Sequence, residues 1–488
     1  MMRKSLFLMT AAVLVATPAL AQLRALRQND VAEAAKQHPQ LVAEFGGAVT
    51  GQRAAYIENI GRRVAAQSGT LNGGQSFHFT TLNSAVENAF SVPGGYVYIT
   101  RQLLGLMGDE AELAFVLGHE TGHVAADHSR TRENRSQRNS IIGVLGAIVG
   151  GVVGNNVFGN LISQGAQQYG QMATLRFSRQ QEYQADQLGI RYITQAGYDP
   201  TAGATMLDAL SRSAALEARV QGKTGRSTPE WASTHPLSEN RSAIARQLAR
   251  QNGRAGQGLR NRDAFLNQLN GTMVDDDPAQ GIIEGTSFTH PDLRLQFNVP
   301  VGFQMQNGTD AVTIAGSSGK AQFAGGRFNG DMQQYVGAVL QQLTGGQAQV
   351  QMNPLQQTNV NGIAAVYTTG RTQTESGVVD VSIFAYQWSA TSAYHFVMLT
   401  QGGQGIGPFQ QMVGSMRRIT PVQAAAIQPR IINVATVRRG DTIQTLASRM
   451  AYRDYRLERF LSLNNLTTAS TLAPGSRVKL IVYGARRS

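Results

Sequence analysis

The pentapeptide His119-Glu120-Thr121-Gly122-His123 gives the strongest indication of fold and chemistry in this chain of 488 residues. It has the form H-E-x-x-H in a region where a helix is expected. Residues four apart on a helix share one face, about 6 Å apart along the axis. Two imidazoles so placed can bind one zinc ion, and Glu120 can reach a water molecule at the metal. The alternative is a pair of surface histidines on an amphipathic helix, and the surrounding sequence favours the metal site.

A catalytic zinc ion usually takes three protein ligands, so two histidines leave the site incomplete. One candidate for the third ligand is His128, which follows five residues after His123. The other is Glu182, because a carboxylate from a second helix completes a His-His-Glu site. Asp186 lies one turn beyond Glu182 on the same face. It can accept a hydrogen bond from the outer nitrogen of a zinc-bound imidazole and so fix its tautomer.

Local patterns predict helices and a hairpin around the pentapeptide. Asp109 can cap the helix that carries it, and Glu112 completes a capping-box-like pattern. Pro93-Gly94-Gly95 is typical of a turn between two strands. The predicted helices cover residues 31–45, 52–67, 111–128 and 175–193, with more helices to about residue 269, and the predicted strands cover residues 77–82, 86–91 and 96–100.

Composition indicates a folded chain of several domains. Charged residues make up 15% and apolar residues 42% of the chain, and there are 53 glycines, which suits a loop-rich protein with ample core. The formal net charge of +12 could favour anionic glycan or lipid. Charge that serves solubility is the simpler explanation. Because no nucleic-acid motif accompanies the charge, no nucleic-acid partner is expected.

The first 21 residues resemble an export signal. Arg3 and Lys4 are followed by an apolar run of signal length and by Ala19-Leu20-Ala21, a small-residue cleavage site, so that Gln22 would begin the mature chain. The run is too short for a comfortable membrane span. The chain has no cysteine, so neither disulfides nor a cysteine-linked lipid is possible. These features predict an exported, periplasmic protein.

Two later regions bear on domain organisation. The apolar run at residues 141–153 would reach only about 20 Å as a helix, against roughly 30 Å for a bilayer core. We favour a buried glycine-rich segment over contact with a membrane surface. From about residue 285 to 420 the pattern predicts an α+β domain with an antiparallel sheet, in which His290 and His395 are structural. Its predicted strands are residues 293–299, 311–315, 364–369 and 378–388, and its predicted helices are residues 332–343 and 409–416.

Residues 30–250 resemble the zinc metallopeptidases that include the CAAX prenyl protease, the heat-shock protease HtpX and the periplasmic outer-membrane-quality-control proteases. The matching motifs are Asn88-Ala89-Phe90 with Pro93-Gly94-Gly95, His119-Glu120-Thr121-Gly122-His123, Glu182-Tyr183-Gln184-Ala185-Asp186, and His235-Pro236 with Arg241. Their order and spacing are more specific than any one motif. Without long transmembrane helices, the chain is most similar to the soluble exported branch.

This resemblance implies a mainly α zincin-like domain and a residue for each catalytic role. It implies that His119, His123 and Glu182 bind one zinc ion per chain, with Glu120 as general base. Charge on the tetrahedral oxygen needs a further partner, and His235 and Arg241 are the candidates. The resemblance also suggests that His235 could occupy the open position on zinc and silence the site. A plain turn histidine is the alternative for His235.

The C-terminal residues 434–484 resemble a LysM module, a small βααβ unit that binds N-acetylglucosamine-containing glycans. The matching segments are Val437-Arg438-Arg439-Gly440-Asp441-Thr442-Ile443, Leu463-Asn464-Asn465-Leu466 and Leu472-Ala473-Pro474-Gly475-Ser476-Arg477-Val478. The resemblance implies tethering to peptidoglycan. The alternative is a docking module that has lost glycan binding.

The sequence therefore predicts an exported zinc endopeptidase that hydrolyses misfolded or stalled envelope proteins. The predicted parts are a signal peptide at residues 1–21, a metallopeptidase domain at 22–270, an α+β domain at 284–420, a linker at 421–433 and the LysM-like module at 434–484. One rival is a chaperone-like or peptidoglycan-anchored binding protein with a latent metal site. Another is a peptidoglycan hydrolase.

Overall fold

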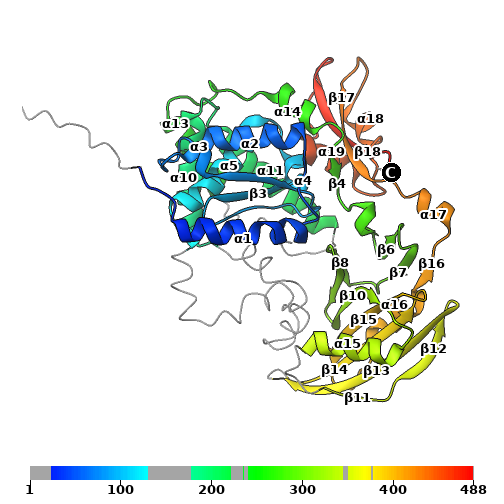
Figure 1. Ribbon diagram of the computed structural model, residues 1–488. Helices are drawn as coiled ribbons and strands as arrows, with labels where there is room; N and C mark the ends of the chain where they lie inside the picture. The colour runs from blue at the N-terminus through cyan, green and yellow to red at the C-terminus, as the bar shows by residue number, and fades with distance from the viewer. Residues whose placement is uncertain are drawn as a thin grey trace, which may run out of the picture.

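The computed structural model describes residues 23–129, 177–220, 235, 240–344, 350–374 and 377–486. The predicted signal peptide and the apolar run at residues 141–153 lie outside these ranges. Figure 1 shows a helical N-terminal part, a sheet-rich middle part and a small C-terminal module beside the first part. Within the described ranges, no helix has the length and apolar character needed to cross a membrane.

The N-terminal part is a set of helices around a small sheet. Figure 1 shows α1 and α2 on either side of the sheet, with α5, α10 and α11 behind it. The elements are α1 (Gln28–Glu44), α2 (Gln52–Ala65), α3 (Gly73–Ser76), β1 (His78–Leu82), β2 (Ala89–Val92), β3 (Tyr96–Thr100), α4 (Arg101–Leu106), α5 (Glu110–Ala125), α10 (Arg179–Gln195), α11 (Ala202–Val220), α13 (Arg241–Gln251) and α14 (Arg262–Leu269). The predicted helices and strands are present here with shifted ends.

The hairpin that precedes the pentapeptide is confirmed. β2 pairs with β3 in antiparallel register, and β1 pairs with the other side of β3 in parallel, which leaves β2 at the edge among the described strands. Gly94 and Gly95 both have positive φ, at 93° and 87°. A Cβ at Gly94 would lie 2.5 Å from the backbone oxygen of Asp30, so the turn needs glycine for space as well as for conformation. The turn therefore packs closely against the first turn of α1.

The helix that carries the pentapeptide begins as predicted and ends earlier. The Asp109 side chain accepts a hydrogen bond from the Glu112 N–H at 3.1 Å, which confirms the cap. The Glu112 carboxylate instead accepts from the Gly108 N–H at 2.7 Å, so the capping box does not close on Asp109. α5 ends at Ala125 rather than near residue 128, because Asp127 adopts a left-handed φ of 56°. His128 therefore lies beyond the end of α5.

Small residues bring α5 and α10 into close contact. A Cβ at Gly189 would lie 3.0 Å from the backbone nitrogen of His119, and one at Gly122 would lie 3.4 Å from the backbone oxygen of Ala185. Glycine at these positions lets the two backbones approach more closely than larger side chains would allow. The buried residues of α10 include Glu182, Asp186 and Gly189, which share one face. The predicted carboxylates are thereby placed against the two histidines of α5.

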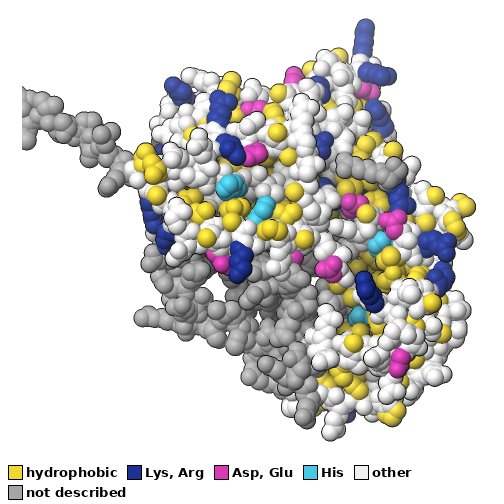
Figure 2. Space-filling model, in the orientation of Figure 1, with side chains coloured by type: hydrophobic (Ala, Val, Ile, Leu, Met, Phe, Trp, Pro, Cys, Tyr) yellow, Lys and Arg dark blue, Asp and Glu magenta, His cyan; other side chains and the backbone are white. Residues whose placement is uncertain are grey.

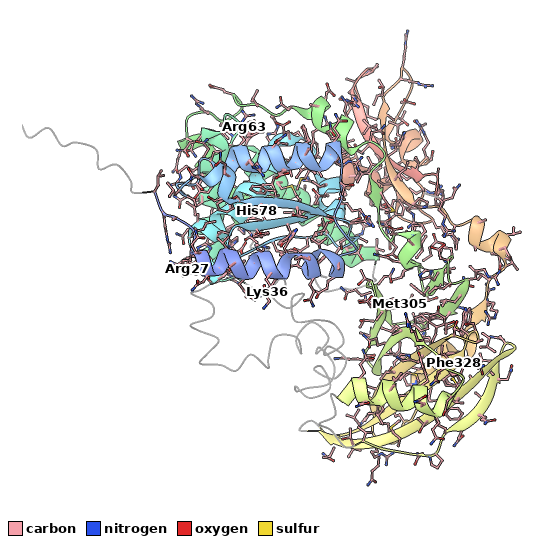
Figure 3. The ribbon with its side chains drawn as sticks, viewed as in Figure 1. Arg27, Lys36, Arg63, His78, Met305 and Phe328 are labelled. Carbon is pink, nitrogen blue, oxygen red and sulfur yellow. The ribbon has the colours of Figure 1, made fainter. Side chains whose placement is uncertain are left out.

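The middle part contains the antiparallel sheet that the alternating pattern predicts. The sheet follows the order β11-β13-β14-β15-β10-β9-β8, with a separate four-stranded sheet β16-β7-β6-β5. One hydrophobic core contains residues of both sheets and of α16, and another lies between the large sheet and α15. The elements are η2 (Pro278–Gln280), β5 (Ile282–Glu284), β6 (Ser287–His290), β7 (Leu295–Asn298), β8 (Gln304–Asn307), β9 (Ala311–Gly316), β10 (Gly319–Arg327), α15 (Met332–Thr344), β11 (Gln351–Met352), β12 (Gln356–Val360), β13 (Ile363–Thr374), β14 (Gly377–Gln387), β15 (Ser392–Gln401), η3 (Gly407–Phe409), α16 (Gln410–Ser415) and β16 (Arg417–Arg418). Figure 3 labels Met305 on β8 and Phe328 just after β10, both well apart from the helical part.

The C-terminal module has the predicted βααβ order. It consists of β17 (Arg430–Thr436), α18 (Ile443–Ala447), α19 (Arg456–Asn464) and β18 (Arg477–Tyr483). Residues 421–433, predicted as a linker, contain α17 (Pro421–Ala425) and the first residues of β17. The predicted linker is therefore partly regular structure.

The module is packed onto the N-terminal part and shares its core. β17 pairs with β4 (Met273–Val274), a short strand that follows α14. Ile432, Leu446 and Phe460 belong to the same buried cluster as the core of α5. The ammonium group of Lys479 on β18 is fully buried and donates to the backbone oxygens of Gly105 and Met107 at 2.7 and 2.6 Å. The module is thus part of the folded unit and not a loosely attached tail.

Lys479 should make stability depend on pH. Burial lowers the pKa of its ammonium group from 10.5 to about 7. Between these values the unfolded chain holds a proton that the folded chain lacks, so the free energy of unfolding should rise with pH by up to about 1.4 kcal/mol per unit. Lys479→Met should remove this slope in urea unfolding curves between pH 7 and 10.5. The control is Lys36→Met, an exposed position on α1 (Figure 3). Equal slopes in wild type and Lys479→Met would contradict the assignment.

Candidate metal centre

Four buried side chains converge where α5 meets α10. The Nε2 atoms of His119 and His123 lie 3.0 Å apart, and Nδ1 of His235 lies 3.2 Å from the former. Glu182 places Oε1 3.0 Å from Nδ1 of His235 and 3.5 Å from Nε2 of His123. One donor atom from each of the four lies within 4.8 Å of all the others. Three of these residues are the predicted ligands, and His235 is the fourth member.

The geometry of this group fits a metal ion such as zinc, and the pKa shifts of His123 and Glu182 favour the protonation states that a metal needs. Metal–ligand distances of about 2.0–2.1 Å in a tetrahedral site put neighbouring donor atoms roughly 3.3 Å apart. The observed separations of 3.0–3.6 Å match that spacing. Metal binding needs neutral imidazole and ionised carboxylate. Burial lowers the pKa of His123 well below its ordinary value. Burial would raise the pKa of Glu182, but His235 and Arg241 lower it.

Comparisons with known proteins agree with this geometry. Residues 51–249 match Peptidase family M48, and this segment contains all four converging side chains. The chain has an M48 peptidase domain. Residues 435–480 match the LysM domain, which agrees with the predicted C-terminal module.

Relatives of the M48 domain include named proteases. The chain is 32% identical over 199 residues to the beta-barrel assembly-enhancing protease of Escherichia coli K12, and 33% identical over 206 residues to that of Yersinia pestis. Each match covers 40% of this chain and 39% of the relative. The mitochondrial metalloendopeptidase OMA1 of Schizosaccharomyces pombe is 30% identical over 186 residues, which is 38% of this chain and 50% of that one. The chain thus spans half or less of the length of these relatives.

A solved structure from Bacteroides thetaiotaomicron aligns with 41% of this chain and 87% of its own, at 10% identity. Its TM-score of 0.25 is too low to support a statement about the fold.

Asp186 is hydrogen-bonded to one of the predicted metal ligands. Its Oδ1 accepts a hydrogen bond from Nδ1 of His119 at 3.0 Å, which leaves Nε2 of that ring for the metal. Arg241 donates to both oxygens of Asp186, at 2.7 and 2.8 Å, and its NH1 lies 2.8 Å from Oε2 of Glu182. Burial would raise the pKa of Asp186, but the guanidinium and these hydrogen bonds lower it to about 2. Arg241 therefore holds two carboxylates of the M48 site in place.

Glu120 lies beside the converging ligands and does not belong to their group. The Ser91 hydroxyl, on the edge strand β2, donates to Oε2 of Glu120 at 3.0 Å and to its backbone oxygen at 3.2 Å. Oε1 of Glu120 lies 3.4 Å from Nε2 of His235 and accepts no hydrogen bond among the described residues. Ser91 thus binds one carboxylate oxygen of Glu120 and leaves the other facing His235.

The structure brings every predicted site residue of the M48 domain together, and it adds two that sequence reasoning missed. Ser91 is one, and its only sequence signal is its position in the predicted hairpin strand. Phe177 is the other, and its ring stacks on His123 with centroids 3.8 Å apart. His128 contacts His123 through ring nitrogens at 2.9 Å but does not belong to the ligand group. It therefore contacts a predicted ligand and lies outside the group of four converging side chains.

The remaining histidines have structural contacts. His38 shares a hydrogen bond of 2.9 Å with the Tyr98 hydroxyl, and His78 stacks on Tyr96. Figure 3 shows His78 on the sheet between α1 and α2. In the middle part, His395 bonds the Tyr335 hydroxyl at 2.8 Å, and Nδ1 of His290 accepts from the Leu293 N–H at 3.3 Å. No described histidine outside the M48 site belongs to a metal-binding group.

Proposed function

We propose that this protein is an exported, periplasmic zinc endopeptidase that hydrolyses peptide bonds in misfolded or stalled cell-envelope proteins. The observation that carries the proposal is the convergence of His119, His123 and Glu182 with Glu120 beside them. A closed structural zinc site has no use for a carboxylate that is held next to the ligands without joining them. The names of the Escherichia coli and Yersinia relatives, beta-barrel assembly-enhancing protease, support the envelope as the place of action.

The chain's own residues supply binding, orientation and proton transfer. His119, His123 and Glu182 would hold one zinc ion per chain. When bound, zinc lowers the pKa of a water ligand and polarises the scissile carbonyl. Glu120 takes the proton of the attacking water and delivers it to the leaving amine. Ser91 keeps the Glu120 carboxylate turned toward that water.

Two predicted oxyanion partners receive different proposed roles. Arg241 is 1% exposed, and its guanidinium contacts Asp186, Glu182 and the backbone oxygen of His235. We assign it a positioning role for these carboxylates. His235 lies between Glu182 and Glu120, at 3.0 and 3.4 Å, where it would occupy the space that water and substrate need. We assign His235 the role of a blocking residue in the resting protein, and its displacement would open the site.

The edge strand offers a way to bind extended substrate. Among the described strands β2 pairs only with β3, and Ser91 on β2 touches the catalytic carboxylate. An unfolded segment that adds to this edge would be held through its backbone, with little dependence on sequence. Unfolded or misassembled envelope proteins are the substrate class that this mode favours.

The C-terminal module would orient the enzyme at the cell wall. Its LysM match supports binding to peptidoglycan, and its shared core with the M48 domain fixes the direction in which the active site faces. Figure 2 shows Lys and Arg scattered over the visible face, without one continuous basic patch on it. We propose domain boundaries at residues 22–270 and 284–420 for the first two domains, and a C-terminal module that extends from Arg430, where β17 begins, to residue 484.

Digestion of casein by wild type and His235→Ala tests the proposed activity. Wild type has to displace His235 before substrate can bind, whereas the variant does not. The variant should therefore cleave casein faster than wild type, by about tenfold for each 1.4 kcal/mol that displacement of His235 costs. A chelator should stop cleavage, and one equivalent of zinc should restore it. Purified peptidoglycan serves as the competing substrate. Absence of casein cleavage by both zinc-loaded proteins would favour a binding protein, and digestion of peptidoglycan alone would favour a wall hydrolase.

A further inference from the structure

The chain turns immediately after α5, and the turn places His128 against His123. Asp127 makes this turn with its left-handed φ of 56°. Aspartate tolerates this conformation better than most residues but less well than glycine. Contacts from elsewhere in the fold therefore have to hold the turn.

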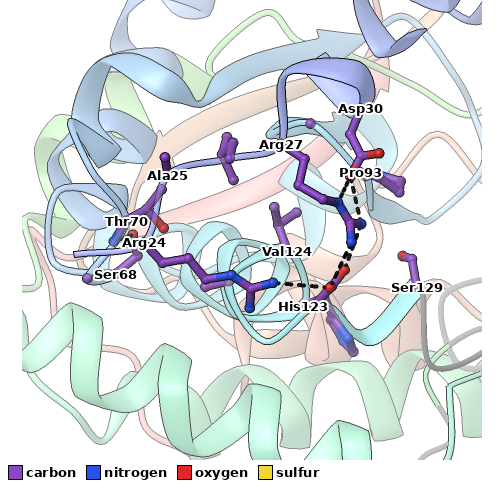
Figure 4. A pocket seen from close by; sticks show the side chains of 15 residues that line it. Arg24, Ala25, Arg27, Asp30, Ser68, Thr70, Pro93, His123, Val124 and Ser129 are labelled. Carbon is purple, nitrogen blue, oxygen red and sulfur yellow. Dashed lines mark hydrogen bonds and ion pairs between the residues drawn. The ribbon is translucent and has the colours of Figure 1, made fainter. Parts of the chain in front are cut away.

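Two arginines from the start of the described chain hold Asp127. Arg27 donates to both carboxylate oxygens, at 3.2 and 3.1 Å, and Arg24 donates to Oδ2 at 3.3 Å. Their segment is fixed by backbone hydrogen bonds with the residues at 69 and 71. Figure 4 shows both guanidinium groups turned toward the end of α5 beside His123, and Figure 3 places Arg27 at the N-terminal end of α1. The side chain of Arg27, which makes the bidentate contact, is less exposed than the side chain of Arg24.

The turn places the His128 ring between a metal ligand and α10. Nδ1 of His128 lies 2.9 Å from Nδ1 of His123, and its Nε2 lies 3.0 Å from Oε1 of Gln184. The amide of Gln181 donates to the backbone oxygen of His128 at 3.1 Å. His128 is 3% exposed. Both glutamines belong to α10, the helix that also supplies Glu182 and Asp186.

These contacts select one tautomer for each ring. The amide oxygen of Gln184 can only accept, so Nε2 of His128 carries the hydrogen and Nδ1 carries the lone pair. Nδ1 of His123 must then donate to Nδ1 of His128. The lone pair of His123 is left on Nε2, the atom that faces Nε2 of His119 at 3.0 Å. This is the tautomer that a metal ion needs on that side.

We propose that His128 is the positioning residue for His123, as Asp186 is for His119. Each ligand of α5 thus has its outer nitrogen fixed by a partner that α10 supports, directly through Asp186 and indirectly through Gln184 and His128. Both ring nitrogens of His128 are engaged in this chain of contacts, which explains why it is not the third metal ligand. The inference rests on the proposed metal site.

A pair of substitutions at one position tests the role through metal affinity. His128→Phe keeps a ring of similar size and removes the acceptor, so zinc affinity, measured by competition with a chromophoric chelator, should fall about 10- to 100-fold. His128→Asn can place its amide oxygen near the former Nδ1 and should stay within a few-fold of wild type. Zinc affinity in His128→Phe equal to wild type, or an equal loss in both variants, would overturn the proposal.

Urea unfolding of the chelator-treated protein shows whether His128→Phe is folded. If it is not, a second pair of substitutions, at Gln184, tests the same role. Gln184→Met removes the acceptor for Nε2 of His128 and should weaken zinc binding, whereas Gln184→Glu keeps it and should not. Equal affinities in these two variants would also overturn the proposal. His119→Ala tests the metal site itself, independently of the role of His128. If His119→Ala loses zinc and His128→Phe does not, only the role of His128 fails. If His119→Ala keeps zinc, the metal site and the proposed function fail together.

Discussion

Glu120→Gln should lower the rate of casein cleavage by about 10²- to 10⁴-fold and leave zinc content at one ion per chain. Glutamine has nearly the same shape and can still accept a hydrogen bond from Ser91. It cannot take a proton from water at neutral pH. The metal should remain because Glu120 is outside the group of four converging side chains.

The measurement is best made in a His235→Ala background, because the blocking ring would otherwise mask the loss. Zinc content is determined on the same samples by elemental analysis. Glu58→Gln is the matched control, since Glu58 pairs with Arg62 on the surface of α2. Cleavage within a few-fold of the background protein would remove Glu120 from the role of general base. Loss of zinc together with activity would make it a ligand instead.

Arg241→Met should reduce the free energy of unfolding by about 3–5 kcal/mol, because it leaves buried carboxylates without their cation. The side chains of Asp186 and Glu182 are 2% and 0% exposed, so water cannot replace the guanidinium. Arg246→Met on the same helix is the control. Arg246 is 48% exposed and pairs with Asp208 at the surface, where such a pair contributes about 0–1 kcal/mol.

Unfolding has to be followed in the presence of a chelator, because bound zinc would stabilise the folded state and offset part of the loss. Urea curves for both variants then compare buried with exposed ion pairs on one helix. A loss from Arg241→Met no larger than that from Arg246→Met would contradict the positioning role of Arg241.

Sequence patterns predicted the local parts of the site. The spacing of His119 and His123 depends only on helical geometry, and so does the shared face of Glu182 and Asp186. Asp109 caps α5 through a contact three residues long, which a sequence shows directly. The hairpin around Pro93-Gly94-Gly95 follows from turn chemistry that acts within the same few residues.

Other parts of the site depend on residues that are far apart in the chain. Ser91 and Glu120 meet because β2 packs beside α5, and nothing in the hairpin sequence names that partner. The end of α5 was predicted too late, because the turn at Asp127 is held by arginines about 100 residues earlier. That turn places His128 against His123 and outside the group of four converging side chains.

The C-terminal module shows the same division on a larger scale. Its βααβ order follows from local turn and cap residues, and residues 437–443 suffice to indicate the kind of module. Its attachment does not follow from them, because Lys479 finds its acceptors at Gly105 and Met107, more than 370 residues away. A charged group in a strand gives no sign of which domain will bury it.

By itself the sequence determined that two histidines share one helix face and that two carboxylates share another, since helical geometry acts over a few residues. Only the tertiary structure decided that these side chains converge, that His235 joins them and where the C-terminal module packs. Those outcomes depend on the close approach of α5 and α10 and on buried contacts between distant segments, where the cost of an unpaired polar group selects one arrangement.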